Sequence, residues 1–155
     1  MRRLNDTRCV VLVCAARRRP RNLQTVLPYE RFAAWQRCHE LVLAVYRITQ
    51  SFPTHELHGL SAQARRAAFS AAANIAEGSV KRGGREFHRY LDMALGALSE
   101  LSYTLRLAND LHLLTDTEWE ELSALRARAG FLTWRLYERL GGKRRLERSA
   151  PGAVS

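Results

Sequence analysis

Four basic residues close together in the middle of the chain are the side chains best suited to bind a ligand. They flank the pair Gly83-Gly84 and are Lys81, Arg82, Arg85 and Arg89. Glycine lets backbone N–H groups approach a phosphate, and the N-terminus of a helix adds a partial positive charge. The pattern therefore indicates a contact for RNA or DNA. The alternative is a solvated turn in which the basic side chains pair with Glu86 and Asp92.

A second group of polar residues lies in the alanine-rich stretch before this turn. Arg65 and Arg66 are adjacent, hence about 100° apart on a helix, so we expect one to pair with an acid on a neighbouring helix and the other to face outward. Both are candidate nucleic-acid contacts. Asn74 and Glu77 are three residues apart and share a helix face. We expect them to form a buried polar pair that fixes the helix register, with a ligand or RNA contact as the alternative.

The remaining titratable residues lack the spacing of an established catalytic or metal-binding motif. A di-iron bundle needs Glu-x-x-His on two helices, and no Asp or Glu has His three residues later. The segment from His55 to His58 is one residue short of the zinc motif H-E-x-x-H, and Cys38 is expected in the core. Neither a nucleophile elbow nor a phosphate-binding loop occurs. We therefore expect no catalytic residue, no metal, no cofactor and no enzyme.

The net charge of +10 is concentrated at the two ends of the chain. Residues 1–28 contain seven arginines and one acid, residues 142–155 carry a net charge of +3, and residues 29–141 are nearly neutral at +1. We expect the first segment to be a disordered extension or the product of a mis-assigned start codon, and the last to be a disordered tail. Both could bind nucleic acid through its phosphates.

The composition also limits where the protein acts. Its apolar runs are too short to span a membrane, and three cysteines without a close pair do not make a disulfide scaffold. The short apolar run 9–16 is followed by Arg17 rather than by the small residues of a signal cleavage site. We expect a cytoplasmic protein that has no membrane partner.

Apolar residues recur at helical spacing in four segments of residues 29–141. The predicted helices are residues 30–51, 61–77, 85–113 and 116–140. Ser61 is the expected N-cap of the second helix and Gly78 its C-terminal stop. Thr115 with Glu118 and Thr117 with Glu120 are overlapping candidate capping boxes for the fourth helix, which Gly141 ends. Short connections between four helices predict an all-α, antiparallel up-down-up-down four-helix bundle.

Several short motifs resemble one known family. They are Gln63-Ala64-Arg65-Arg66-Ala67-Ala68, Ala73-Asn74-Ile75-Ala76-Glu77-Gly78, Phe52-Pro53 with Glu56 and Gly59-Leu60, and Glu86-Phe87 with Tyr90-Leu91. The sequence from about 29 to 141 is similar to the bacterial four-helix-bundle proteins encoded in intervening sequences of large-subunit ribosomal RNA genes. The resemblance implies a homo-oligomer, commonly a pentameric ring, without an established biochemical activity. It also implies a relation to the accessory proteins of diversity-generating retroelements, basic pentamers that bind nucleic acid and a reverse transcriptase.

Two functions fit these observations. The first is a non-enzymatic assembly module, indicated by the four apolar stripes, the alanine-rich second helix and a surplus of aromatic residues expected at the surface, namely Trp35, Tyr46, Trp134 and Tyr137. The second is a module that binds structured RNA through the basic turn. The near-neutral charge of residues 29–141 differs from the basic retroelement proteins, which favours the first function.

Overall fold

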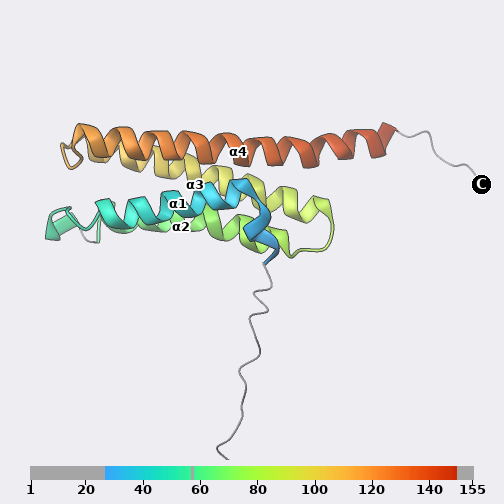
Figure 1. Cartoon of the computed structure of the whole chain (residues 1–155), viewed down its shortest axis with the longest axis horizontal. Helices are drawn as coiled ribbons and strands as arrows, with labels where there is room; N and C mark the ends of the chain where they lie inside the picture. Colours follow the sequence, from blue (N-terminus) through green and yellow to red (C-terminus); the bar gives the residue numbers. More distant parts are fainter. Residues whose placement is uncertain (1–26, 57, 150–155) are drawn as a thin grey trace, which may run out of the picture.

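The computed structural model describes residues 27–56 and 58–149, and the side chains of these residues up to Gly141. Every regular element in that part of the chain is helical. The elements are η1 (Pro28–Arg31), α1 (Ala33–Ile48), η2 (Thr54–Glu56), α2 (Leu60–Ser79), α3 (Gly84–Asp110) and α4 (Asp116–Ser149). The four long helices run alternately in opposite directions (Figure 1).

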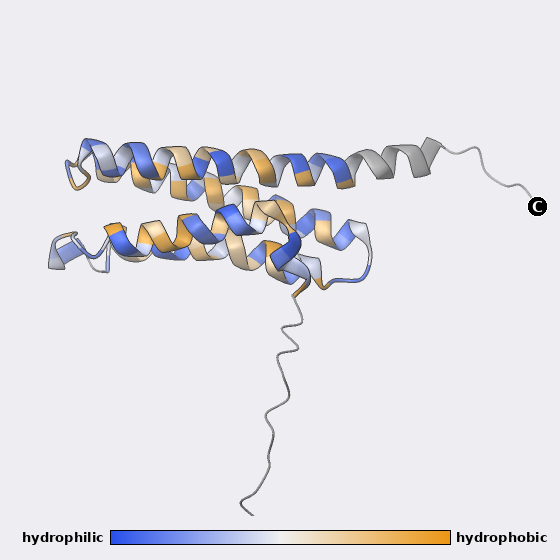
Figure 2. Ribbon diagram, in the orientation of Figure 1, coloured by the Kyte–Doolittle hydropathy of each residue, from blue (hydrophilic) through white to orange (hydrophobic). Residues whose placement is uncertain are grey.

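Each long helix packs against two neighbours, so that the four form a closed square. α1 contacts α2 and α4, and α3 contacts the same two helices from the other side. The pair α1–α2 therefore lies across the bundle from the pair α3–α4. This arrangement confirms the all-α fold and the up-down order of the helices. Figure 2 shows that hydrophilic and hydrophobic residues alternate along each helix. Within the described residues, none of the helices has the length and hydropathy of a membrane span.

The core is built from one stripe of each helix. On α1 the buried side chains include Cys38, Leu41, Val45 and Ile48, which recur at spacings of three and four residues. The Cys38 thiol lies 3.8 Å from the Thr133 hydroxyl of α4, and burial raises the pKa of this thiol to about 11. Cys38 is thus a protonated core residue at neutral pH, as its place in the sequence predicts.

α2 is the helix with the smallest core side chains, and it approaches α3 closely. Five of its buried residues are alanines, together with Ile75 and Gly78. A Cβ atom built on Gly78 would lie 2.6 Å from Tyr90 Cβ and 2.7 Å from Phe87 Cδ2, both on α3. The prediction that Gly78 stops the helix is therefore wrong: it lies inside α2, and its missing side chain lets the two helices meet.

The sequence predicts the N-terminal cap of α4 correctly but not that of α2. Ser61 is not the N-cap of α2, because it is buried inside the helix and Gly59 occupies the cap position. Gly59 has no side chain that could cap the helix. Instead, the Glu56 carboxylate accepts a hydrogen bond from the Leu60 N–H at 3.0 Å. At α4 the first of the two candidate capping boxes is the one that forms, since the Thr115 hydroxyl accepts from the Glu118 N–H at 3.3 Å and Glu118 accepts from the Thr115 N–H at 2.9 Å.

α4 is longer than predicted. Gly141 does not end it, because the helix continues to Ser149 and extends beyond the other three helices (Figure 1). A Cβ on Gly141 would lie 3.1 Å from His88 Nε2 of α3, so Gly141 packs closely against this side chain. The first eight residues of the predicted tail 142–155 are thus helical, whereas residues 1–26 and 150–155 lie outside the described residues.

A methyl group at Gly78 should destabilise the bundle. Alanine favours a helix by up to ~1 kcal/mol over glycine, but the close contact with Tyr90 Cβ requires α2 and α3 to move apart. We expect Gly78→Ala to lower the free energy of unfolding by about 1–3 kcal/mol, measured by urea unfolding at low protein concentration.

The matched control for this substitution is Gly96→Ala. Gly96 lies inside α3, and no atom lies within 4 Å of a Cβ built on it. The same change there should therefore raise the free energy of unfolding by up to ~1 kcal/mol. Equal unfolding free energies for the two alanine variants would show that close packing at Gly78 does not constrain the fold.

Candidate functional site

The basic turn predicted from the sequence connects α2 to α3, but one of its four charges is already used. Lys81 Nζ lies 3.1 Å from the Glu77 carboxylate and 5.2 Å from the centre of the Tyr90 ring. The Tyr90 hydroxyl donates to the same Glu77 oxygen at 2.7 Å. Lys81, Glu77 and Tyr90 therefore form a local cluster that holds the end of α2 against α3.

The charges in this cluster stabilise one another. The hydrogen bond from Tyr90, followed by that from Lys81, lowers the pKa of Glu77 below its ordinary value. The hydrogen bond to Glu77, followed by that to Tyr90, raises the pKa of Lys81. Because both groups are fully exposed, water screens the pair and its effect on stability is small.

The other three basic residues of the turn remain available at the surface. Arg82, Arg85 and Arg89 are exposed and form no ion pair with any described residue, so the expected pairing with Glu86 and Asp92 does not occur. Gly83 has a φ of +92°, in the region that favours glycine, and α3 starts at Gly84.

The two arginines of α2 belong to a different part of the molecule. Arg65 Nε donates to the Thr49 hydroxyl at 2.8 Å and its guanidinium lies 5.2 Å from the centre of the Tyr46 ring, so the expected acidic partner is wrong. Arg66 is exposed, as expected of one of the pair, and donates to Gln63. Sixteen residues of mostly helical chain, about 24 Å, separate Arg65 from Lys81. The six basic candidates therefore do not form one surface.

Asn74 and Glu77 do not form the buried pair that their spacing predicts. Asn74 is buried and its amide donates to the Ser70 carbonyl at 2.8 Å and to the Ser70 hydroxyl at 3.2 Å. Glu77 is exposed and bonds to Tyr90. The structure thus gives Asn74 a local role within α2 and Glu77 a role between α2 and α3.

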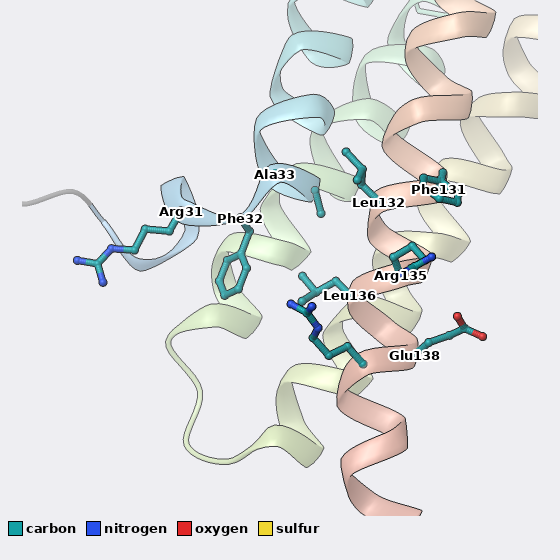
Figure 3. A pocket seen from close by; sticks show the side chains of 10 residues that line it. Arg31, Phe32, Ala33, Phe131, Leu132, Arg135, Leu136 and Glu138 are labelled. Atoms are coloured by element: carbon teal, nitrogen blue, oxygen red, sulfur yellow. The ribbon is translucent and has the colours of Figure 1, made fainter.

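Two grooves along α4 are the surface features that sequence reasoning missed. On one side, α4 and the start of α1 enclose a groove of about 800 Å³, shown in Figure 3. Its lining includes Arg31, Ala33, Leu132, Arg135 and Arg139. The groove is therefore apolar along its floor and basic along its rim.

The second groove lies between α3 and α4 and has a volume of about 530 Å³. It is lined by Leu95, Leu98 and Trp134, with Asp92 and Arg126 also contributing. Two glycines, Gly96 of α3 and Gly130 of α4, also line it, and a Cβ on either would have no atom within 4 Å. Phe131 and Trp134 are only three residues apart, yet each lines a different groove. The sequence gives the angle between these two side chains around α4. Only the packing shows that one of them borders the groove beside α1 and the other the groove beside α3.

The near-neutral charge of residues 29–141 hides a separation of charge along the bundle axis. Contacts from Arg47 to Glu121 and from Gln63 to Glu100 show which levels of the helices correspond. The half that holds the α1–α2 and α3–α4 connections, residues 43–66 and 100–125, contains seven acidic and four basic residues. The other half contains ten basic and six acidic residues. Its end includes the α2–α3 turn and leads into the basic extension of α4 (Figure 1).

The described residues form no cluster typical of a metal site. No group of three or more His, Cys, Asp or Glu residues that could hold a metal ion occurs in the described ranges.

Residues 30–130 match the family of 23S rRNA-intervening sequence proteins. The chain belongs to this family. The match covers α1, α2, α3 and the first half of α4, so the walls of the α3–α4 groove lie almost wholly inside the family region. No curated protein matches the sequence.

Removing the Tyr90 hydroxyl should raise the pKa of Glu77. A carboxyl group whose pKa is lowered on folding adds stability above its unfolded pKa and loses it as the pH falls through the folded pKa. Tyr90→Phe removes the strongest cause of the lowering, so the Glu77 titration measured by NMR should move up toward 4.5. Tyr103→Phe, at an exposed tyrosine of the same helix, is the control and should leave that titration unchanged. An unshifted Glu77 in the Tyr90 variant would contradict the contact.

Proposed function

We propose that this 23S rRNA-intervening sequence protein is a non-enzymatic assembly module that forms a homo-oligomer, in the form of a ring of five subunits. The observation that carries the proposal is a pair of unpartnered apolar surfaces on opposite sides of the bundle. Exposed apolar patches on a single chain are typical of protein interaction sites. A ring requires two different complementary surfaces on each subunit, whereas a two-fold dimer requires only one.

The first surface is the α3–α4 groove. Trp134 is 48 % exposed although it is the largest apolar side chain in the groove. The glycines at 96 and 130 leave the helix backbones uncovered, so that side chains of another subunit can approach them closely. This surface is concave and receptive.

The second surface lies on α1 and α2, across the bundle from the first. Leu43, Tyr46 and Phe69 project from these helices and are 58 %, 44 % and 61 % exposed. Arg65 lies over the Tyr46 ring and one turn before Phe69, which places the aromatic side chains on the outer side of the α1–α2 pair. This surface is convex, so it complements the groove of a neighbouring subunit.

Two of the four aromatic residues predicted to be at the surface are exposed, and the other two are half-buried. Tyr46 and Trp134 are exposed, as predicted. Trp35 and Tyr137 are half-buried, because Trp35 stacks on His39 with ring centres 5.0 Å apart and Tyr137 packs on His88 at 3.8 Å. The assembly proposal rests on the first two.

Complementary variants test the ring directly by sedimentation equilibrium of the full chain. Gly96→Gln fills the groove and Phe69→Gln removes the largest projection, so each variant alone should be monomeric. An equimolar mixture keeps one intact interface and should form a heterodimer that stops there. Leu111→Gln, which changes an exposed apolar residue at the end of the bundle, is the control and should assemble as the unmodified chain does.

Other outcomes would reject the proposal. A chain that stays monomeric at tens of micromolar, well above the Kd of a specific interface of standard size, is not an assembly module. If Gly96→Gln disrupts assembly and Phe69→Gln does not, the subunits pair groove to groove and the ring is wrong.

The exposed arginines of the α2–α3 turn support a second candidate function, the binding of structured RNA. Arg82→Glu together with Arg85→Glu should abolish binding of an RNA hairpin and leave the helical circular dichroism unchanged, because phosphate contacts dominate affinity. Arg66→Glu together with Arg106→Glu makes the same change in charge at the opposite end and should have little effect. Equal losses in both double variants would show that net charge alone governs RNA binding. The relation to retroelement accessory proteins belongs to this second proposal.

A further inference from the structure

The basic groove between α1 and α4 is not used by either proposed function. Its floor consists of apolar side chains from both helices, among them Ala33, Ala34, Leu132 and Leu136. Figure 3 shows Leu132 and Leu136 on the side of α4 that faces α1. A volume of about 800 Å³ lies within the range of sites that enclose a ligand, and an open groove between two helices has the shape that receives a third.

Positive charge lines the rim of this groove. Arg135 and Arg139 are exposed and lie one turn apart on α4, about 6 Å along the helix. Arg31 contributes to the opposite rim from η1, and Figure 3 shows its exposed side chain directed away from α4. None of these arginines forms an ion pair with a described residue. Among the described residues that line the groove, Glu138 is the single acidic one.

The charge of the N-terminal segment of the same chain does not match this groove. Residues 1–26 directly precede η1, and they contain seven arginines and one acid. They therefore repel the arginine rim. The α1–α4 side of the bundle also lies between the two surfaces proposed for assembly, so a neighbouring subunit leaves it uncovered. The charge and the shape of the groove call for an external partner that is acidic and apolar together.

We propose that the α1–α4 groove binds an acidic amphipathic helix of a partner protein. Apolar side chains on one face of that helix pack on Leu132, Leu136 and the two alanines. Acidic residues spaced four apart on its edge have the same rise as Arg135 and Arg139, so each carboxylate meets one guanidinium. The site is distinct from the α2–α3 turn, and its accessibility in the assembled protein rests on the proposed assembly surfaces.

The test uses a fluorescein-labelled peptide of about 18 residues, roughly five helical turns, with leucine on one face and glutamate on the other. Its anisotropy is measured with the full chain. We expect saturable binding, and Arg135→Glu together with Arg139→Glu should weaken it by about tenfold or more, because two charge-assisted contacts are reversed. Ala33→Trp, which fills the groove without changing charge, should weaken it as well.

Matched controls separate this site from bulk electrostatics. Arg82→Glu together with Arg85→Glu makes the same change in net charge on another surface and should alter the affinity by no more than about twofold, the effect of screened surface charge. A leucine–lysine peptide of the same length should not bind. Sedimentation of the Arg135/Arg139 variant should show the same assembly as the unmodified chain.

Three results would overturn the proposal. Equal loss of affinity in both double variants would show that the peptide senses only net charge. Binding of poly-uridine RNA, and not of the peptide, with dependence on Arg135 and Arg139 would assign the groove to nucleic acid. Loss of self-assembly in the Arg135/Arg139 variant would show that a second copy of the chain occupies the groove.

Discussion

The close approach of α2 to α3 is the constraint on which the bundle depends. A glycine at position 78 and alanines along the core of α2 allow the backbones of the two helices to meet. The exposed Lys81–Glu77–Tyr90 cluster lies at the same end of this contact and adds polar contacts between the two helices. With α2 and α3 held together, α1 and α4 can only close the square from the other side. The positions of both grooves follow, because each groove has α4 as one wall.

α4 brings the chemically distinct surfaces of this protein together. One edge carries arginines toward α1, and another carries Trp134 and Gly130 toward α3. The buried edge supplies Leu122, Ala129 and Thr133 to the core. A helix that contacts two neighbours and extends beyond both leaves much of its surface exposed. This explains how a small bundle with no metal cluster in its described residues can still offer separate binding surfaces.

The sequence predicts the helices well because helix formation is decided locally. Apolar spacing identifies all four, and the Thr115–Glu118 capping box is formed within a single turn. The errors arise where distant residues decide. Gly78 is a stop signal by its type, and only the position of Tyr90 shows that it is a contact. Likewise, Gly141 and Gly142 each weaken α4 by about 1 kcal/mol relative to alanine, and the good helix formers from Lys143 to Arg148 can offset this cost.

The candidate sites were harder to predict for the same reason. Glu77 finds a partner thirteen residues away on α3, and the α1–α4 groove combines residues about one hundred positions apart in the sequence. The basic turn could be located because its residues are adjacent in sequence. The Glu77–Lys81 ion pair was missed, although a spacing of four residues favours such a pair; only the contribution of Tyr90 required knowledge of the packing.

The uneven distribution of charge along the bundle gives each subunit an electric dipole parallel to its helices. In a ring with cyclic symmetry whose axis runs parallel to the helices, all subunits point the same way and these dipoles add. Such a ring would be a disc with one electropositive and one electronegative face. It would meet a charged surface in a single orientation, and in low salt its unlike faces would attract, stacking the discs into columns that dissolve as the ionic strength rises.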